Sequence, residues 1–131
     1  MWRGERTDRP VVVVGDTIEI DFYPWDFKEE YWIAPLPGIN DEEETTLEED
    51  FEDIFYEVLS EYIPIKRLAV RHCTQVSRNG METKFSCDVT LETADGEIYE
   101  GCIRTTAYLV GGLTWEEGPI RGMEGELRRI T

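Results

Sequence analysis

Hydrophobic and polar residues alternate in different ways along the chain, and each pattern predicts an element. Residues Val11–Val14 form a short apolar run, and the sequence TIEIDFY that follows alternates between hydrophobic and polar side chains. A period of two is typical of a β-strand with one buried face. We therefore expect Ile18, Ile20 and Phe22 to face a core.

Residues 24–38 have no regular period. The segment contains three prolines, one glycine and the aromatic residues Trp25, Phe27, Tyr31 and Trp32. Proline and glycine interrupt regular structure. The composition predicts an aromatic-rich loop, or at most a short helical turn from Asp26 to Trp32.

A helix is predicted next, because seven hydrophobic residues recur at spacings of three and four. At 100° per residue they fall within an arc of about 140°, as in a helix with one core face. The seven are Leu47, Phe51, Ile54, Phe55, Val58, Leu59 and Tyr62. Thr45 or Thr46, with Glu48 or Glu49 three residues later, offers a capping box, and Pro64 is expected to end the helix.

After Pro64 the alternation returns and predicts a series of strands. Asn79-Gly80 lies between two alternating runs and is a strong signal for a two-residue hairpin loop. With that loop, both apolar sets share one face of the sheet. The expected pairs are Leu68 with Leu91, Val70 with Val89 and His72 with Cys87.

A second turn is predicted at Ala94-Asp95-Gly96, with Gly96 in the left-handed region. A three-residue loop directs Tyr99, Ile103 and Ala107 toward the core, whereas a two-residue loop would reverse the faces. The residues expected on the other face are Cys102, Arg104, Thr106 and Tyr108.

The elements together predict one α+β domain over residues 1–131. One amphipathic helix would pack on an antiparallel β-meander of four or five strands, as in helix-gripping or cystatin-like architectures. A third turn is expected at Gly111-Gly112, and the sequence GELRRIT is expected to form a last, edge strand. A chain of this length supports one core.

Charge changes this picture, because it is concentrated in one part of the chain. The net charge is -16, and residues 29–63 contain thirteen acids and no Lys or Arg. That segment carries -13, and the rest, with sixteen acids and thirteen basic residues, carries only -3. A salt-adapted protein would spread its acids more evenly. The composition also lacks the excess of Lys and Arg that direct binding to nucleic acid or to an anionic membrane requires.

On the predicted helix, Glu49, Asp53, Glu57 and Glu61 follow one another at intervals of four residues. Successive carboxylates would lie roughly 6 Å apart along the axis, a spacing that resembles a phosphate backbone. Like charges at this spacing destabilise a helix. One interpretation is a solvated face that keeps the protein in solution; the other is a surface that docks on a basic partner.

The second interpretation gives a functional hypothesis. We expect a non-enzymatic inhibitor that mimics nucleic acid, of the phage-encoded anti-restriction or anti-CRISPR type, and occupies the basic groove of a nucleic-acid-binding protein or nuclease. Aromatic residues commonly anchor such interfaces. The expected partner-binding residues are Asp41, Glu42, Glu43, Glu44, Glu49, Glu52, Asp53, Glu57, Trp25, Phe27 and Trp32.

Three alternatives stay open at this point. The same surface could belong to an immunity protein that neutralises a nuclease toxin. The domain could instead hold a small-molecule or enzymatic pocket between helix and sheet, which would require a polar residue such as His72 in a sizeable cavity. It could also be a subunit of an assembly, a homodimer included, with Trp25, Trp32 and Trp115 buried at the contact.

Catalytic and cofactor chemistry finds little support in the sequence. His72 and Cys87 could form a nucleophilic pair, but both are expected in the core. A zinc site lacks any C-x-x-C pair, and the DEEE run lacks the calcium-loop pattern. The C-terminal glycines do not follow a phosphate-loop order, and Glu116 and Glu117 lie in an expected turn. We expect no enzyme activity, metal or cofactor.

Cysteine usage and hydropathy bear on the compartment. Cys73, Cys87 and Cys102 are an odd number at long spacings, which favours reduced thiols. The sequence shows neither an apolar run of about 20 residues nor the hydrophobic stretch of a signal peptide. We expect a cytoplasmic protein.

Overall fold

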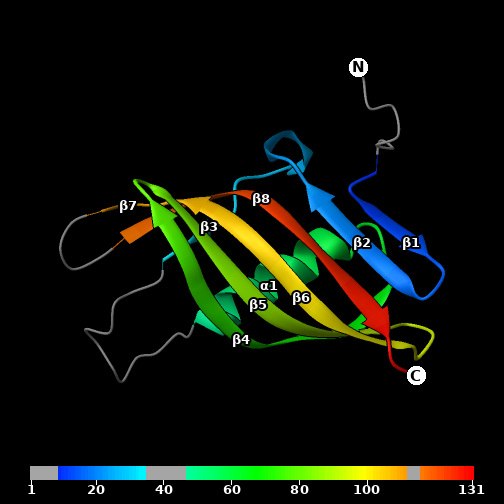
Figure 1. Cartoon of the computed structure of the whole chain (residues 1–131). Coiled ribbons are helices and arrows are strands. Elements are labelled where there is room, and N and C mark those ends of the chain that lie inside the picture. The colour runs from blue at the N-terminus through cyan, green and yellow to red at the C-terminus, as the bar shows by residue number, and fades with distance from the viewer. Residues whose placement is uncertain (1–8, 35–46, 112–115) are drawn as a thin grey trace, which may run out of the picture.

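A computed structural model describes residues 9–34, 47–111 and 116–131 of the chain. Within these ranges, eight strands form one antiparallel sheet of order β1-β2-β8-β6-β5-β4, and both β3 and β7 pair with β8. The elements are β1 (Val11–Val14), β2 (Thr17–Phe22), the 3-10 helix η1 (Pro24–Asp26), β3 (Trp32–Ile33), α1 (Leu47–Leu59), β4 (Ile65–Asn79), β5 (Glu82–Thr93), β6 (Ile98–Tyr108), β7 (Val110–Gly111) and β8 (Glu116–Arg129). The helix α1 lies across one face of the sheet (Figure 1).

The predicted α+β architecture of one helix on four or five strands is wrong. Most of the described chain is strand, and the N-terminal strands β1 and β2 belong to the same sheet as the later meander. They join it through β8, which lies between β2 and β6. The sequence GELRRIT therefore forms part of a central strand and not an edge. Leu127 is fully buried there, opposite Ile18 on one side and Gly101 on the other.

The predicted helix is confirmed. Its hydrophobic face packs on the sheet, where the Phe51 ring lies 5.4 Å from that of Phe55 and 5.5 Å from that of Phe85. Burial of each such side chain contributes about 1.5–3 kcal/mol. The buried helix residues are Phe51, Ile54, Phe55, Val58 and Leu59. The capping residues Thr45 and Thr46 lie outside the described ranges.

The turn of the β4–β5 hairpin is one residue away from the expected one. Its turn residues are Gly80, with a φ of 69°, and Met81, where Asn79 and Gly80 were expected. Register shifts at Arg71 and Val76 then add two extra residues to β4, and each bulge moves the register by one position. The shifts compensate for the displaced turn. The confirmed pairs are Leu68–Leu91 and Val70–Val89.

The expected pairing of His72 with Cys87 is wrong, because the bulge just before His72 reverses its direction. His72 pairs with Asp88, and its side chain is 67% exposed. Cys73 takes the position opposite Cys87, and the two form a disulfide under the helix. The expectation of reduced thiols is therefore wrong for this pair, and Cys102 is the free cysteine.

The second hairpin has the predicted three-residue loop. The backbone N–H of Thr93 donates to the carbonyl oxygen of Glu97 at 2.9 Å, and Gly96 has a φ of 91°. The predicted core positions Tyr99, Ile103 and Ala107 are all buried.

Two glycines allow β6 and β8 to approach each other closely. A Cβ on Gly101 would collide with the carbonyl oxygen of Glu126, and one on Gly125 would collide with that of Cys102. Because neither strand carries a side chain at these points, the sheet can bend around the helix. Because the helix covers one face of the sheet, the outer side of the helix and the other face of the sheet are two separate surfaces (Figure 1).

Candidate protein-binding surface on the helix

Four carboxylates form a row along the outer side of α1 and just beyond its end. Glu49, Asp53, Glu57 and Glu61 are all exposed, as their spacing predicts. The core residues of the helix occupy the opposite side and hold it against the sheet. Successive carboxylates lie roughly one helical turn, about 6 Å, apart. We call these four residues the acidic row.

A lysine partly neutralises one end of the row. Lys28, in the segment after η1, lies 2.9 Å from Glu61, measured from Nζ to Oε1. The hydrogen bond to Glu61 and its negative charge raise the pKa of Lys28. Asp53 and Glu57 make no ion pair with any described residue. The middle of the row therefore carries the negative charge that a partner would meet.

Asp50 shows that charge accumulates on this helix. Burial raises the pKa of the Asp50 carboxyl, and the charges of Asp53 and Glu49 raise it further. All three effects disfavour the ionised form. The helix thus holds its acids at some electrostatic cost, as repulsion between close carboxylates requires.

The segment between β2 and β3 extends the acidic surface beyond the helix. Burial raises the pKa of Tyr31, and the charges of Glu57, Glu29 and Glu61 add to the effect, so these groups lie near one another. The carbonyl oxygen of Tyr31 accepts a hydrogen bond from the backbone N–H of Ile120 at 2.8 Å. This contact, together with the pairing of β3 with β8, fixes the segment beside the end of the helix.

The three aromatic residues predicted to bind a partner differ in their surroundings. Trp32 is 50% exposed, and its Nε1 donates to Glu30 Oε1 at 3.1 Å, so this indole lies beside one of the acids of the segment. Trp25 is 74% exposed and contacts Tyr23 edge to face at 5.1 Å. Phe27 instead stacks on Phe22 at 5.3 Å and packs against the core. Phe27 is therefore half-buried at the border of the core, and its role in binding a partner stays a prediction.

Two helix acids turn toward the sheet and not toward solvent. Glu52 Oε1 accepts a hydrogen bond from the backbone N–H of Val70 at 3.2 Å, and Glu48 Oε2 accepts one from that of Cys73 at 2.9 Å. Both donors belong to β4, the edge strand of the sheet. Glu52, predicted to bind a partner, is therefore the acceptor for a backbone N–H of an edge strand. The remaining predicted acids, Asp41, Glu42, Glu43 and Glu44, lie outside the described residues.

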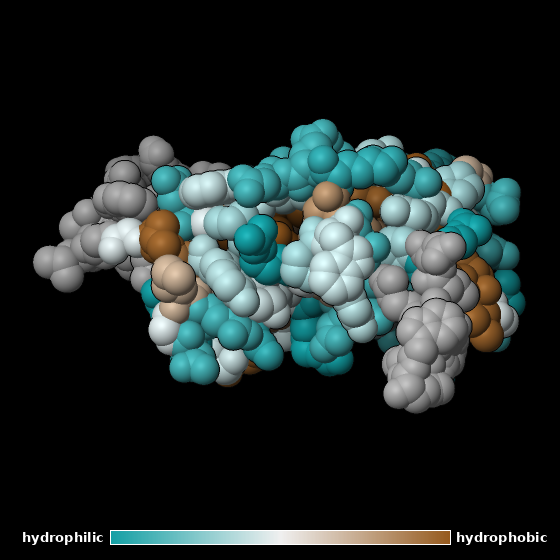
Figure 2. Space-filling model, turned by 90° about the horizontal axis from the view of Figure 1, so that it is seen from above, coloured by the Kyte–Doolittle hydropathy of each residue, from teal (hydrophilic) through white to brown (hydrophobic). Residues whose placement is uncertain are grey.

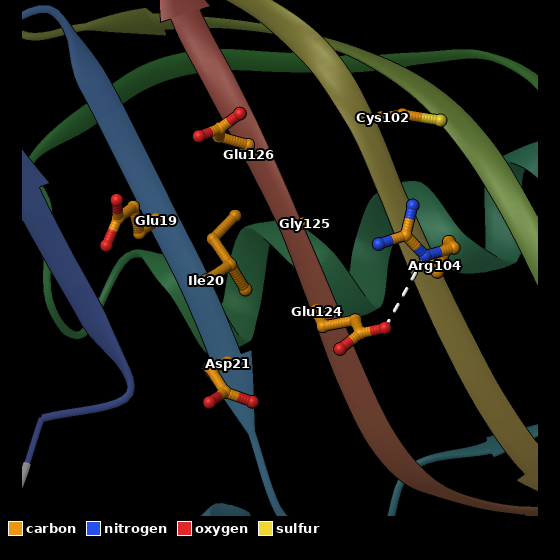
Figure 3. A pocket seen from close by; sticks show the side chains of 8 residues that line it. All are labelled: Glu19, Ile20, Asp21, Cys102, Arg104, Glu124, Gly125 and Glu126. Atoms are coloured by element: carbon orange, nitrogen blue, oxygen red, sulfur yellow. Dashed lines mark ion pairs between the residues drawn. The ribbon is translucent and has the colours of Figure 1, made fainter. Parts of the chain in front are cut away.

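A second acidic group, on the outer face of the sheet, was not predicted (Figure 3). Glu19 lies opposite Glu126, and Asp21 opposite Glu124, on the neighbouring strands β2 and β8. They border a shallow groove of about 550 Å³. Arg104 from β6 is the cation in the view, with its Nε 3.5 Å from Glu124 Oε2. Alternation placed these acids on one face, but only the pairing of β2 with β8 brings them together.

The structure does not bring together the residues that a nucleophilic pair, a metal site or a pocket between helix and sheet would need. His72 is exposed, and Cys87 is bound in a disulfide between the sheet and the helix, so no nucleophilic pair forms. Among the residues that the structure describes, no cluster of three or more His, Cys, Asp or Glu side chains could hold a metal ion. The large rings of Phe51, Phe55 and Phe85 fill the space between helix and sheet, which disfavours a ligand pocket there.

A small cavity at the end of the helix is also too small for a ligand. Phe22, Phe27, Val58 and Tyr62 line it, and its volume is about 10 Å³, about the least that could hold one water molecule. Figure 2 shows hydrophilic side chains over most of the surface seen from above, with hydrophobic residues in small separate patches.

Comparison of the chain with protein-family models, with curated protein sequences and with solved structures found no match. No helix in the described part of the chain is long and apolar enough to cross a membrane.

Proposed function

We propose that the protein is a non-enzymatic inhibitor that binds a basic, nucleic-acid-binding partner through the acidic row and the adjoining segment around Trp32. The observation that carries the proposal is the contrast between neighbouring helix acids. Glu52 accepts a hydrogen bond from the backbone of β4, whereas Asp53 and Glu57 are exposed and make no ion pair with described residues. A regular line of such charges offers a basic groove the same pattern as a nucleic-acid strand.

Inhibition would proceed by competition. The row would occupy sites for phosphate groups, and Trp32 would supply apolar contact area beside it. Charge complementarity would accelerate association and make it depend on salt, because screening weakens attraction between exposed charges. The proposal places this action in the cytoplasm, where a restriction or CRISPR-type nuclease as the kind of target would be met; the Cys73–Cys87 disulfide is uncommon for that compartment and does not support this part of the proposal. A nuclease toxin as the target would make the protein an immunity protein with the same surface.

The test compares two variants with the same change in net charge. Asp53→Lys/Glu57→Lys reverses the middle of the acidic row, and Glu117→Lys/Glu126→Lys reverses two exposed acids of β8. Each protein is immobilised as bait for a lysate of the native host context at low and high salt. Duplex DNA and RNA are then tested as competitors for whatever is retained.

The proposal predicts that the wild-type bait retains a nucleic-acid-binding protein that high salt or DNA displaces. The helix variant should lose at least tenfold of this retention, and the β8 variant should keep it. Equal retention by both variants would contradict a role for the acidic row. Retention of no basic protein at low salt would leave the row as an ordinary solvated face.

A further inference from the structure

The sheet face away from α1 contains a cleft that adjoins the acidic groove of β2 and β8 and shares Asp21, Arg104 and Glu124 with it. It has a volume of about 410 Å³, within the range of roughly 300–1,000 Å³ that is usual for small-molecule sites. Its floor includes Gly122 of β8, which pairs with Thr106 of β6. Because a glycine carries no side chain, the surface of the sheet forms a depression at this point, and the side chains of neighbouring residues surround it.

The side chains around the floor bring together cations from three strands. Lys84 comes from β5, Arg104 from β6 and Arg121 from β8. The carboxylates Asp21 and Glu124 also line the cleft, so its lining carries one net positive charge. In a chain with a net charge of -16, this is a local reversal of sign.

The existing ion pairs of these cations are loose and exposed. Lys84 Nζ lies 3.8 Å from Glu82 Oε2, and Arg104 Nε lies 3.5 Å from Glu124 Oε2. Exposed pairs of this kind contribute little stability, so a stronger anion can compete for the cations. The third cation, Arg121, lies with its guanidinium carbon 5.8 Å from the centre of the Tyr108 ring.

Two tyrosines add flat apolar surface at the same place. Tyr108 is 42% exposed and Tyr23 is 37% exposed, and both line the cleft. Trp25 contacts Tyr23 edge to face and continues the aromatic surface outward. A ring on such a surface gains stacking energy, and arginine planes stack on rings as well.

We infer that this cleft binds a small anion that carries a flat ring, the chemistry shared by nucleoside monophosphates and aromatic carboxylates. The ring lies over Gly122 and Thr106 between the tyrosines, and the anionic group reaches Arg121 and Arg104. Guanidinium groups bind phosphate and carboxylate in a bidentate manner, which gives the site its selectivity for an anion. The site is independent of the acidic row, because it lies on the opposite face of the sheet from α1.

The test is an NMR titration of the ¹⁵N-labelled protein with three probes. Adenosine monophosphate and benzoate carry a ring and an anion, and adenosine carries the ring alone. We expect saturable shifts of the Thr106 and Gly122 amide signals with at least one of the two anions and affinity at least fivefold weaker for adenosine. The anion that binds tells whether phosphate or carboxylate is preferred. No saturable shift with either anion, or equal affinity for adenosine, overturns the inference.

Variants locate the site. A Cβ on Gly122 would lie 3.6 Å from the Phe22 carbonyl oxygen, an ordinary contact, so Gly122→Leu fills the cleft at little cost to the fold. It should weaken the anion at least tenfold, and Arg121→Gln should do so severalfold. Arg128→Gln removes an exposed cation of the same strand outside the cleft and should change nothing.

Thr106→Leu serves as a second filler if the Gly122 variant loses its native spectrum. Undiminished binding in a folded filler variant would show that the anion binds elsewhere and would overturn the inference. Asp53→Lys/Glu57→Lys should bind the anion as the wild type does, so this result and the test of the acidic row can fail separately.

Discussion

Thr83 and Thr105 are two of the three buried polar residues in the described part of the chain. Both are at most 1% exposed, and neither hydroxyl has a hydrogen-bond partner among the described residues. A buried hydroxyl without a partner costs free energy that an apolar group of the same shape avoids. These two side chains therefore lower the stability of the sheet.

Thr105→Val should raise the free energy of unfolding by about 1 kcal/mol, because valine keeps the shape and removes the unpaired hydroxyl. Urea denaturation measures the change. Thr106→Val is the matched control, since Thr106 is half-buried on the opposite face of the same strand, and should change the value by less than about 0.5 kcal/mol. A lower stability of Thr105→Val would mean that the hydroxyl has a partner after all.

Asp50 gives the acidic helix a pH dependence of defined sign. Its pKa is raised above 3.8 in the folded protein, first by burial and then by Asp53 and Glu49. Above the raised pKa the carboxyl is ionised in both states, so the native state carries the full penalty there. As pH falls through the raised pKa, the native state takes up the proton before the unfolded state does, and stability rises.

Asp50→Asn should therefore stabilise the protein at pH 7, and the difference from wild type should vanish below about pH 3.8. Since the carboxyl is only partly buried and screened by water, the expected gain is about 0.5 kcal/mol. Denaturation curves at pH 7, 5 and 3.5 measure it. A difference that grows toward low pH would have the wrong sign for this explanation.

At the scale of elements, the contact between α1 and β4 explains how an exposed edge is protected. An edge strand presents unpaired N–H groups that can pair with another chain. Glu48 and Glu52 accept hydrogen bonds from two of them, at Cys73 and Val70. The helix thus covers the edge with side-chain acceptors as well as with its hydrophobic face.

Glu48→Ala and Glu52→Ala should each lower the free energy of unfolding by about 1–2 kcal/mol, because each leaves a strand N–H without its charged acceptor. Hydrogen exchange should accelerate most at the amide of Cys73 for the first variant and of Val70 for the second. Asp53→Ala, an exposed acid of the same helix, is the control and should do neither. Unchanged exchange at both amides would contradict the role of these acids.

Local patterns predicted the elements better than their arrangement. The helix and the Ala94–Gly96 turn follow from spacing and from glycine. Bulges at Arg71 and Val76 leave no mark in the alternation, so the exposure of His72 could not be read from it. The central position of β8 depends on pairing with β2, about a hundred residues earlier in the chain, and no local pattern records it.

The candidate site was predictable to the extent that the helix face determines it. Glu49 and Asp53 lie opposite the apolar arc, and both are exposed. Glu48 falls inside that arc on a helical wheel, which is the sequence signal that it turns inward. Glu52 lies about 20° outside the arc, as the exposed Glu61 does on its other side, so its inward direction could not be predicted from its position. The groove beside Arg104 depends on the order of the strands, so it could not be predicted from the sequence.

At the scale of the whole molecule, stability and the proposed function place opposite demands on the acidic row. Replacing Asp53 with lysine would put a cation four residues from both Glu49 and Glu57 and turn two repulsions into attractions. A helix selected for stability alone would contain such a residue. The observed sequence keeps the repulsion.

Asp53→Lys should therefore raise the free energy of unfolding by about 1 kcal/mol at low salt, and by less at 0.5 M NaCl, where screening weakens both repulsion and attraction. Its retention of a basic partner should fall at the same time. Urea denaturation at the two salt concentrations and the bait experiment measure the two effects in one protein. A solvated face without a partner predicts the gain in stability with retention unchanged. A gain in stability that accompanies a loss of binding would show that the carboxylates of α1 are kept for recognition.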